Sequence, residues 1–152
     1  MGAEISVYLP NIPGQFSRVL MALHSKRLQV RGFNVDGGGA LRQLHLLFTN
    51  VHEAERAKVA LADYNYEVIS TEVLLLSSDV PWALLRITEV LAGNDINIDG
   101  GYSVGQTESG EELFVLKVAD GQAASALECL AAYGFTERDP LDSATAPLPS
   151  AS

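Results

Sequence analysis

Two stretches of the sequence decide the fold: residues 5–16 read ISVYLPNIPGQF, and residues 73–84 read VLLLSSDVPWAL. Each begins with apolar residues typical of a strand, passes through an Asx-x-Pro turn, and continues into apolar residues at helical spacing. The second stretch starts 68 positions after the first. The sequence therefore predicts one strand–turn–helix unit that occurs twice.

The match continues beyond these stretches. In the first strand, Val73 and Leu75 take the places of Ile5 and Val7. Further pairs recur at an offset of 68 through the first helix and 69 beyond the second strand: Val19 with Ile87, Leu23 with Leu91, Leu44 with Leu113, Leu46 with Val115, Ala57 with Ala126, and Leu61 with Leu130. Because one extra residue explains the whole second half, the pattern indicates an internal duplication.

Each copy predicts the element order β-α-β-β-α-β, which is the ferredoxin-like split βαβ arrangement of the α+β class. The expected second strands are 30–35 and 96–104, the third strands 43–49 and 113–118, the second helices 51–64 and 122–133, and the fourth strands 66–70 and 135–138. We therefore expect repeat 1 over residues 1–70 and repeat 2 over residues 71–139. Because the connection between them is very short, we expect them to pack as an intrachain pseudo-dimer.

Composition excludes several functions. The chain has 152 residues, a formal net charge of −9 and only ten basic residues, which argues against binding nucleic acid. No apolar run approaches the roughly 20 residues of a membrane span, and the N-terminus lacks the pattern of a signal peptide, so we expect a cytoplasmic protein without a membrane partner. His24, His45, His52 and the single Cys129 lack the spacing of a zinc site, so no metal or cofactor is predicted. Residues 140–152 are rich in Pro, Ser and Ala and predict a disordered tail.

The turn residues carry a resemblance to a known family. Asn11-Ile12-Pro13-Gly14, followed by a helix and then by Leu28-Gln29-Val30, resembles the ACT domain signature, and repeat 2 supplies Asp79-Val80-Pro81 and Ile96-Asn97-Ile98. With no enzyme attached, the chain looks like the free-standing tandem ACT proteins, a group that includes regulators resembling the glycine cleavage system repressor. The resemblance implies an allosteric regulatory protein that binds an amino acid or related metabolite between paired units. It also implies a homo-oligomer such as a dimer, and a regulated metabolic enzyme as partner.

The preferred site lies at the turn of repeat 1. The first N–H groups of a helix have no internal partner and suit a carboxylate, and a glycine lets a ligand approach the backbone. An Asn side chain both donates and accepts hydrogen bonds. Carried over from the ACT pattern, the residues of this site are Asn11, Ile12, Pro13, Gly14 and Gln15, with Asn97 and Ile98 from repeat 2.

A second and weaker site follows from the other turn, with Asp79, Val80, Pro81 and Trp82 of repeat 2 and Gln29 of repeat 1. Trp82 stands where the glycine should be, so its bulk would fill or cover this pocket. A simpler alternative for both turns is that Asn11 and Asp79 only cap the helices that follow.

Two other functions stay open beside ligand-dependent regulation. One is a structural interaction module that binds no ligand. The other is a small enzyme on a ferredoxin-like scaffold, which is disfavoured because no acid, base and nucleophile cluster in the sequence and nothing resembles a nucleophile elbow. We therefore predict a protein that is not an enzyme.

Overall fold

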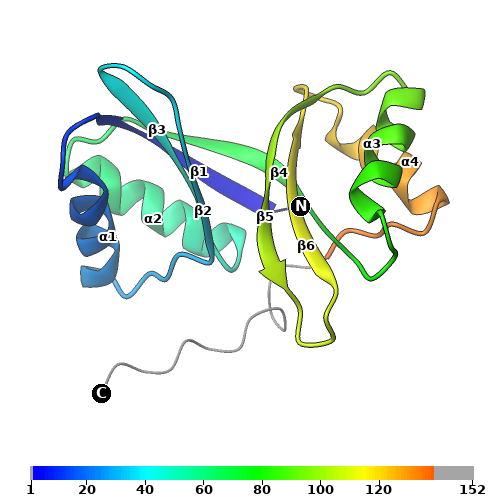
Figure 1. The fold of residues 1–152 in the computed structure, drawn as a ribbon. Coiled ribbons are helices and arrows are strands. Elements are labelled where there is room, and N and C mark those ends of the chain that lie inside the picture. Colours follow the sequence, from blue (N-terminus) through cyan, green and yellow to red (C-terminus); the bar gives the residue numbers. More distant parts are fainter. Residues whose placement is uncertain (1, 139–152) are drawn as a thin grey trace. The chain divides into compact units, whose positions relative to one another are not determined.

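The computed structural model describes residues 2–138, and the predicted tail at 140–152 lies outside them. The chain separates into two compact units, Gly2–Thr71 and the residues from Glu72 onward. Each unit has helices on one face of an antiparallel sheet (Figure 1). No helix within residues 2–138 is long and apolar enough to cross a membrane.

The first unit contains the predicted element order. Its elements are β1 (Gly2–Pro10), α1 (Gln15–Ser25), β2 (Gly32–Asp36), β3 (Leu41–Leu47), α2 (Val51–Asp63) and the beginning of β4 (Val68–Ser78). The strands lie in the order β2-β3-β1-β4, and just before β4 the carbonyl of Glu67 accepts a hydrogen bond from the N–H of Tyr8 at 3.3 Å. This is the strand order of a ferredoxin-like sheet, so the predicted fold of repeat 1 is confirmed.

The core of the first unit lies between this sheet and its two helices. Ile5, Val7 and Leu9 alternate along β1 and are buried with residues of both helices. The contributing side chains of α1 and α2 recur every three to four residues, as expected for one face of a helix. They are Val19, Ala22, Leu23, Ala54, Ala57, Ala60 and Leu61.

The second unit repeats this arrangement. Its elements are the remainder of β4, α3 (Ala83–Gly93), β5 (Ile98–Gln106), β6 (Glu112–Val118) and α4 (Ala123–Ala132). The last strand of repeat 1 and the first strand of repeat 2 are therefore one continuous strand. The predicted strand at 135–138 is reduced to a single bridge between Glu137 and Leu76, next to which the N–H of Arg138 donates to Leu75 O at 2.8 Å.

The predicted pairing of strand residues between the repeats is wrong by one position. In the second unit the side chains that pack against α3 and α4 are Leu74 and Leu76 of β4 with Phe114 and Leu116 of β6. Val73, Leu75, Leu113 and Val115 are buried as well, but they alternate with the first set and therefore point to the opposite face of the sheet. Because residues 73–76 and 113–116 are apolar at every position, no alternation exists from which the face could be predicted.

The corrected pairing also changes how the strand-to-helix turns of the two repeats are matched. Val7 of β1 is equivalent to Leu76 of β4, whereas Gly14 and Trp82 both immediately precede a helix. Between the strand and the helix lie residues 11–14 in repeat 1 and residues 79–82 in repeat 2, so the two turns are equally long. The distance along the chain from Val7 to Gly14 is nevertheless one residue longer than the distance from Leu76 to Trp82, because β1 continues one residue further than the equivalent part of β4.

Candidate functional site

The turn after β1 borders a cavity that lies wholly within the first unit. Its volume is about 440 Å³, within the range of about 300–1,000 Å³ found for small-molecule pockets. All five residues predicted for this site in repeat 1 line it, together with side chains of the neighbouring strands. The lining residues are Leu9, Pro10, Asn11, Ile12, Pro13, Gly14, Gln15, Phe16, Val35, Arg42 and Leu44.

Asn11 does not cap α1, so the capping alternative is wrong for this turn. Its Nδ2 donates to the carbonyl of Gly39 at 2.9 Å, and its Oδ1 accepts from Nε of Arg42. The N–H of Asn11 donates to the carbonyl of Ala40 at 2.9 Å. Asn11 therefore ties the turn to the hairpin between β2 and β3 and orients Arg42. An amide has two N–H donors and two acceptor lone pairs, so both ends keep capacity for a ligand.

Gly14 supplies the open backbone that the sequence predicts. It precedes α1 with φ of 89° and ψ of −11°, a left-handed conformation in which no side-chain hydrogen bond caps the helix. No atom lies within 4 Å of the place that a Cβ would take, so the space over Gly14 is free. The first N–H groups of α1 lie beside this space, and Gln15 and Phe16 also line the cavity.

Arg42 is the site residue that sequence reasoning missed. It lies on β3 opposite Leu9, and antiparallel pairing brings it to the turn from a distant part of the chain. No Asp or Glu occurs among the residues that line this cavity, so no carboxylate of the lining opposes the positive charge of the Arg42 guanidinium and of the N-terminal end of α1. The available signal was its place on a strand expected to pair with the strand that precedes the turn.

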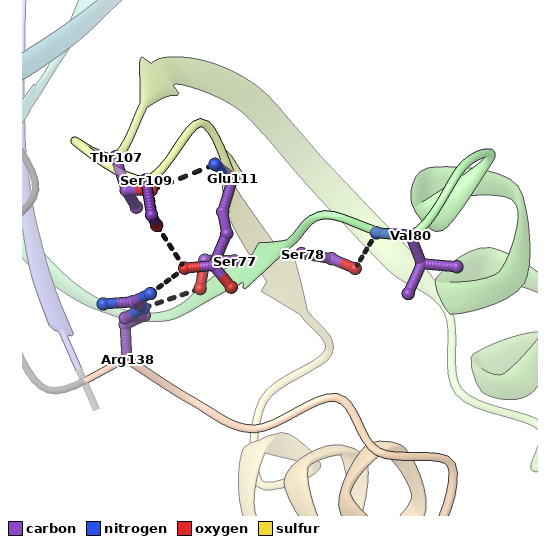
Figure 2. A network of polar contacts seen from close by, with 7 residues as sticks. All are labelled: Ser77, Ser78, Val80, Thr107, Ser109, Glu111 and Arg138. Carbon is purple, nitrogen blue, oxygen red and sulfur yellow. Dashed lines mark hydrogen bonds and ion pairs between the residues drawn. The ribbon is translucent and has the colours of Figure 1, made fainter.

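The turn of repeat 2 also lacks a capping side chain, so the capping alternative is wrong for Asp79. The hydroxyl of Ser78, not Asp79, accepts from the N–H of Val80 at 3.1 Å (Figure 2). Trp82 adopts φ of 62° and ψ of 27° and is 80% exposed. A cavity of about 390 Å³ lies beside this turn within the second unit, and Trp82 is not among the residues that line it. That Trp82 fills or covers a pocket shared with Gln29 stays a prediction.

The remaining predicted residues lie outside these cavities. Asn97 is exposed and donates from Nδ2 to Asp99 Oδ1 at 2.8 Å, and Ile98 begins β5 and packs against the core of the second unit. Gln29 is exposed between α1 and β2 of the first unit. That Asn97 and Ile98 complete the site at Asn11, and Gln29 the site at Asp79, stays a prediction.

A buried polar cluster on β1 and β3 was also missed from the sequence. Nδ1 of His45 lies 2.8 Å from Oε1 of Glu4 and 2.9 Å from Oγ of Ser6. Because both contacts use the same ring nitrogen, the imidazole does not bridge the hydroxyl and the carboxylate as it does in a catalytic triad. Among residues 2–138 no group of three or more His, Cys, Asp or Glu side chains is placed to hold a metal ion.

Known proteins resemble this chain in fold. No family model matches the sequence, and no curated protein matches it. A protein from Bacteroides thetaiotaomicron of known structure is similar with a TM-score of 0.77 and 18% identity, over 88% of this chain and 89% of that one. The ligand-free regulatory subunit of aspartate kinase from Thermus thermophilus is similar with a TM-score of 0.62 and 18% identity, over 86% and 91%. The regulatory subunit of aspartate kinase from Thermus flavus is similar with a TM-score of 0.60 and 18% identity, again over 86% of this chain and 91% of that one.

These similarities extend over nearly the whole chain and over nearly the whole of each of those proteins. They confirm the predicted fold class: the chain has a tandem ferredoxin-like fold of the ACT type. This is the architecture of a regulatory subunit in the two Thermus structures.

Proposed function

We propose that the protein is a regulatory protein that binds a small metabolite with a carboxylate group, most simply an amino acid, at the turn of repeat 1. One observation carries this proposal: the cavity at this turn joins an open glycine, the N-terminus of α1 and the side chains of Asn11 and Arg42. These groups all favour negative charge, and the cavity lining contains no acid.

The remaining lining suits the rest of such a ligand. Leu9, Phe16, Val35 and Leu44 form an apolar wall of the cavity. A carboxylate held by Arg42 would place an aliphatic or aromatic substituent against this wall. Hydrogen bonds to charged groups contribute about 1.5–3 kcal/mol each, so one such bond changes affinity by about 10- to 100-fold. We further propose that Asn97 and Ile98 of repeat 2 contribute to recognition.

Ligand occupancy would act on a partner. The similar Thermus proteins are regulatory subunits of a metabolic enzyme, which supports the proposal that this chain regulates an enzyme or its own association into a homodimer. We propose that it has no catalytic activity of its own and acts in the cytoplasm.

Thermal-shift screening against the twenty amino acids tests this function. A ligand at 100 times its Kd stabilises the folded protein by about 2.7 kcal/mol. Arg42→Gln is expected to weaken binding by about 10- to 100-fold. The control is Arg18→Gln, which is expected to leave binding unchanged, because Arg18 is exposed in the same unit and does not line this cavity. If no amino acid raises the melting temperature, the proposed function is wrong. If Arg42→Gln binds as well as Arg18→Gln, the ligand site lies elsewhere.

The roles of the two amides are tested separately. Asn11→Ala removes the bond that orients Arg42 and is expected to weaken binding in the same assay. Asn97→Ala measures the proposed contribution of repeat 2, and unchanged affinity would remove Asn97 from the site.

One observation favours a second function, an interaction module that needs no ligand. Large apolar side chains are exposed around the start of α3: Val80, Trp82, Leu84, Leu85 and Tyr133. Such surfaces often mark contacts with other proteins. This function predicts that Leu85→Glu changes the mass measured by light scattering, whereas no amino acid changes the melting temperature.

A further inference from the structure

We propose that the first unit has a second cavity that binds a nucleoside monophosphate. This cavity has a volume of about 390 Å³, and its lining comes from α2 and from the loop that follows α1. It shares no lining residue with the cavity at the turn of repeat 1. The inference therefore goes beyond the proposed function and does not rest on it.

The negative charge of the chain is unevenly distributed along the sequence. Residues 2–71 contain seven Lys or Arg and six Asp or Glu, a formal net charge of +1. Residues 72–152 contain three basic and thirteen acidic residues, a net charge of −10, and the two halves together give the total of −9. Charges further away than about 8 Å are largely screened at physiological salt, so the charges at the cavity itself decide which ligand binds. The total charge is thus no argument against an anionic ligand of the first unit.

Three side chains of the lining can donate hydrogen bonds to an anion: Lys26, His52 and Arg56. Nη2 of Arg56 donates to the carbonyl of Lys26 at 3.2 Å, which holds the guanidinium beside the end of α1 and uses only one of its five N–H groups. Within residues 2–138 the ammonium of Lys26 and the imidazole of His52 have no hydrogen bond or ion pair. In the second unit, by contrast, Arg138 is paired with Glu111 (Figure 2). The cavity of the first unit therefore keeps its donors available for a ligand.

Repeat 2 shows that the packing of the helices does not require these charges. Lys26 and Asn94 are the equivalent C-caps of α1 and α3, and buried Ala57 of α2 is equivalent to buried Ala126 of α4. At these offsets each charged or histidine residue of the lining is matched by an uncharged residue: Lys26 by Asn94, His52 by Gly121, Glu55 by Ala124, Arg56 by Ser125 and Asp63 by Ala132. Both helix pairs pack together all the same. The charged set is therefore specific to this cavity and is not a requirement of the fold.

The donors and the apolar part of the lining suit a phosphate that is attached to a base. Lys and Arg recognise phosphate oxygens, and Arg can do so through two parallel hydrogen bonds. Leu28 and Ala60 of the lining are buried, and Val59, one turn after Arg56 on α2, is 61% exposed. A phosphate bound at Arg56 would place an attached planar base against these apolar side chains, which inorganic phosphate could not use.

The two acids of the lining suit the sugar. Glu55 and Asp63 repel a phosphate, but a carboxylate accepts hydrogen bonds from ribose hydroxyls, as an acid does in dinucleotide-binding folds. Glu55 and Asp63 lie in one row along α2 and Arg56 in the neighbouring row, because residues four or eight apart share a face. Asp63 also follows Arg56 by seven residues, which corresponds to about 10 Å along the helix. A nucleoside monophosphate, with its phosphate, hydroxyls and base, therefore matches all three groups of lining residues.

Isothermal titration calorimetry of the whole 152-residue chain tests the inference. The probes are AMP, GMP, CMP and UMP. The ligand controls are the corresponding nucleosides, which lack the phosphate, and ribose 5-phosphate, which lacks the base. We expect at least one of the four nucleotides to bind in a saturable manner, and the controls to bind at least about 10-fold more weakly.

Two variants introduce the residues that repeat 2 has at the equivalent places. Lys26→Asn and Arg56→Ser each remove a donor for the phosphate and are expected to raise the Kd of the nucleotide by at least about 10-fold. The side chain of Lys26 makes no hydrogen bond or ion pair within residues 2–138, so Lys26→Asn tests binding without the loss of a structural contact. The matched control is Lys58→Gln, which removes a positive charge from the same helix outside the cavity and should bind as the wild type does. Circular dichroism verifies that each variant is folded.

Three results overturn the inference: no nucleotide binds, Lys26→Asn and Arg56→Ser both bind like Lys58→Gln, or a control ligand binds as tightly as the best nucleotide. A nucleotide whose binding is lost in Arg42→Gln but kept in Arg56→Ser would also overturn it, because that nucleotide occupies the turn of repeat 1. The proposed function is judged separately. An amino acid that binds to Arg56→Ser but not to Arg42→Gln supports the proposed function even when no nucleotide binds.

Discussion

Neighbouring glycines on β5 offer a sharp test of the structure of repeat 2. A Cβ added to Gly101 would lie 2.7 Å from the carbonyl oxygen of Val115 and 2.8 Å from Cδ2 of Leu116. A Cβ added to Gly100 would meet only Cδ of Lys117, at 3.9 Å. Neither glycine has a positive φ, so the two substitutions to alanine differ in steric contact and not in backbone strain.

The expected cost of Gly101→Ala follows from these distances. The carbonyl oxygen of Val115 belongs to β6, and Gly101 pairs with Leu116 of the same strand, so the clash is relieved only by displacing β5 from β6. Overpacking of this kind costs about 1–3 kcal/mol, and the contact with backbone places Gly101→Ala in the upper half of that range. Gly100→Ala is expected to be neutral or to stabilise by about 0.5 kcal/mol, since a glycine inside a strand is entropically unfavourable.

Urea unfolding of the two variants, followed by the fluorescence of Trp82 in the same unit, measures this difference. Each kcal/mol corresponds to about 4–8 °C in Tm for a domain of 60–100 residues, so thermal melts give a second readout. The pairing of β5 with β6 described above would be refuted if Gly101→Ala were as stable as Gly100→Ala.

Three further predictions concern stability. Asn50→Ala removes the side-chain acceptor for the N–H of Glu53 at the start of α2 and should cost about 1 kcal/mol in urea unfolding; an unchanged midpoint would show that this cap contributes nothing. The Cβ of Gly14→Ala would meet no atom within 4 Å, but the alanine would have to adopt the left-handed φ of 89°. A thermal melt should therefore show a loss of about 1–2 kcal/mol in the free energy of unfolding, and unchanged stability would contradict that conformation. Ile87→Ala, at a fully buried position, should cost about 2–5 kcal/mol, whereas Leu84→Ala on the exposed side of α3 should cost less than about 1; similar losses in calorimetry would mean that α3 is rotated.

Helices and turns could be predicted from the sequence because their signals are local. Val19 and Ile87 were matched correctly across the repeats, since a helix that buries one face must place apolar residues at a period of 3.6. The β4 and β6 strands of repeat 2 could not be oriented in this way. Leu74 and Leu75 are equally apolar and both buried, so only the hydrogen-bonded register shows which of them packs against the helices.

The same difference between local and long-range signals applies to the residues of the candidate sites. Asn11 and Gly14 were found from the sequence because they are close in the chain and belong to one turn motif. Arg42 and Arg138 were missed because each reaches its cavity from a distant segment, through the pairing of β3 with β1 or through the bridge beside Glu137.

The sequence by itself determined that the chain is a duplication, the order of its elements and the position of both turns, since these depend on covalent neighbours and on periodic burial. Only the tertiary structure decided which charges surround each turn. The cavity at the turn of repeat 1 is lined by Arg42 and by no Asp or Glu. The cavity at the turn of repeat 2 is lined by Asp79 and Arg86 and by the ion pair of Arg138 with Glu111. The physical reason is that strand pairing brings together side chains whose separation in the sequence carries no information about their distance in space.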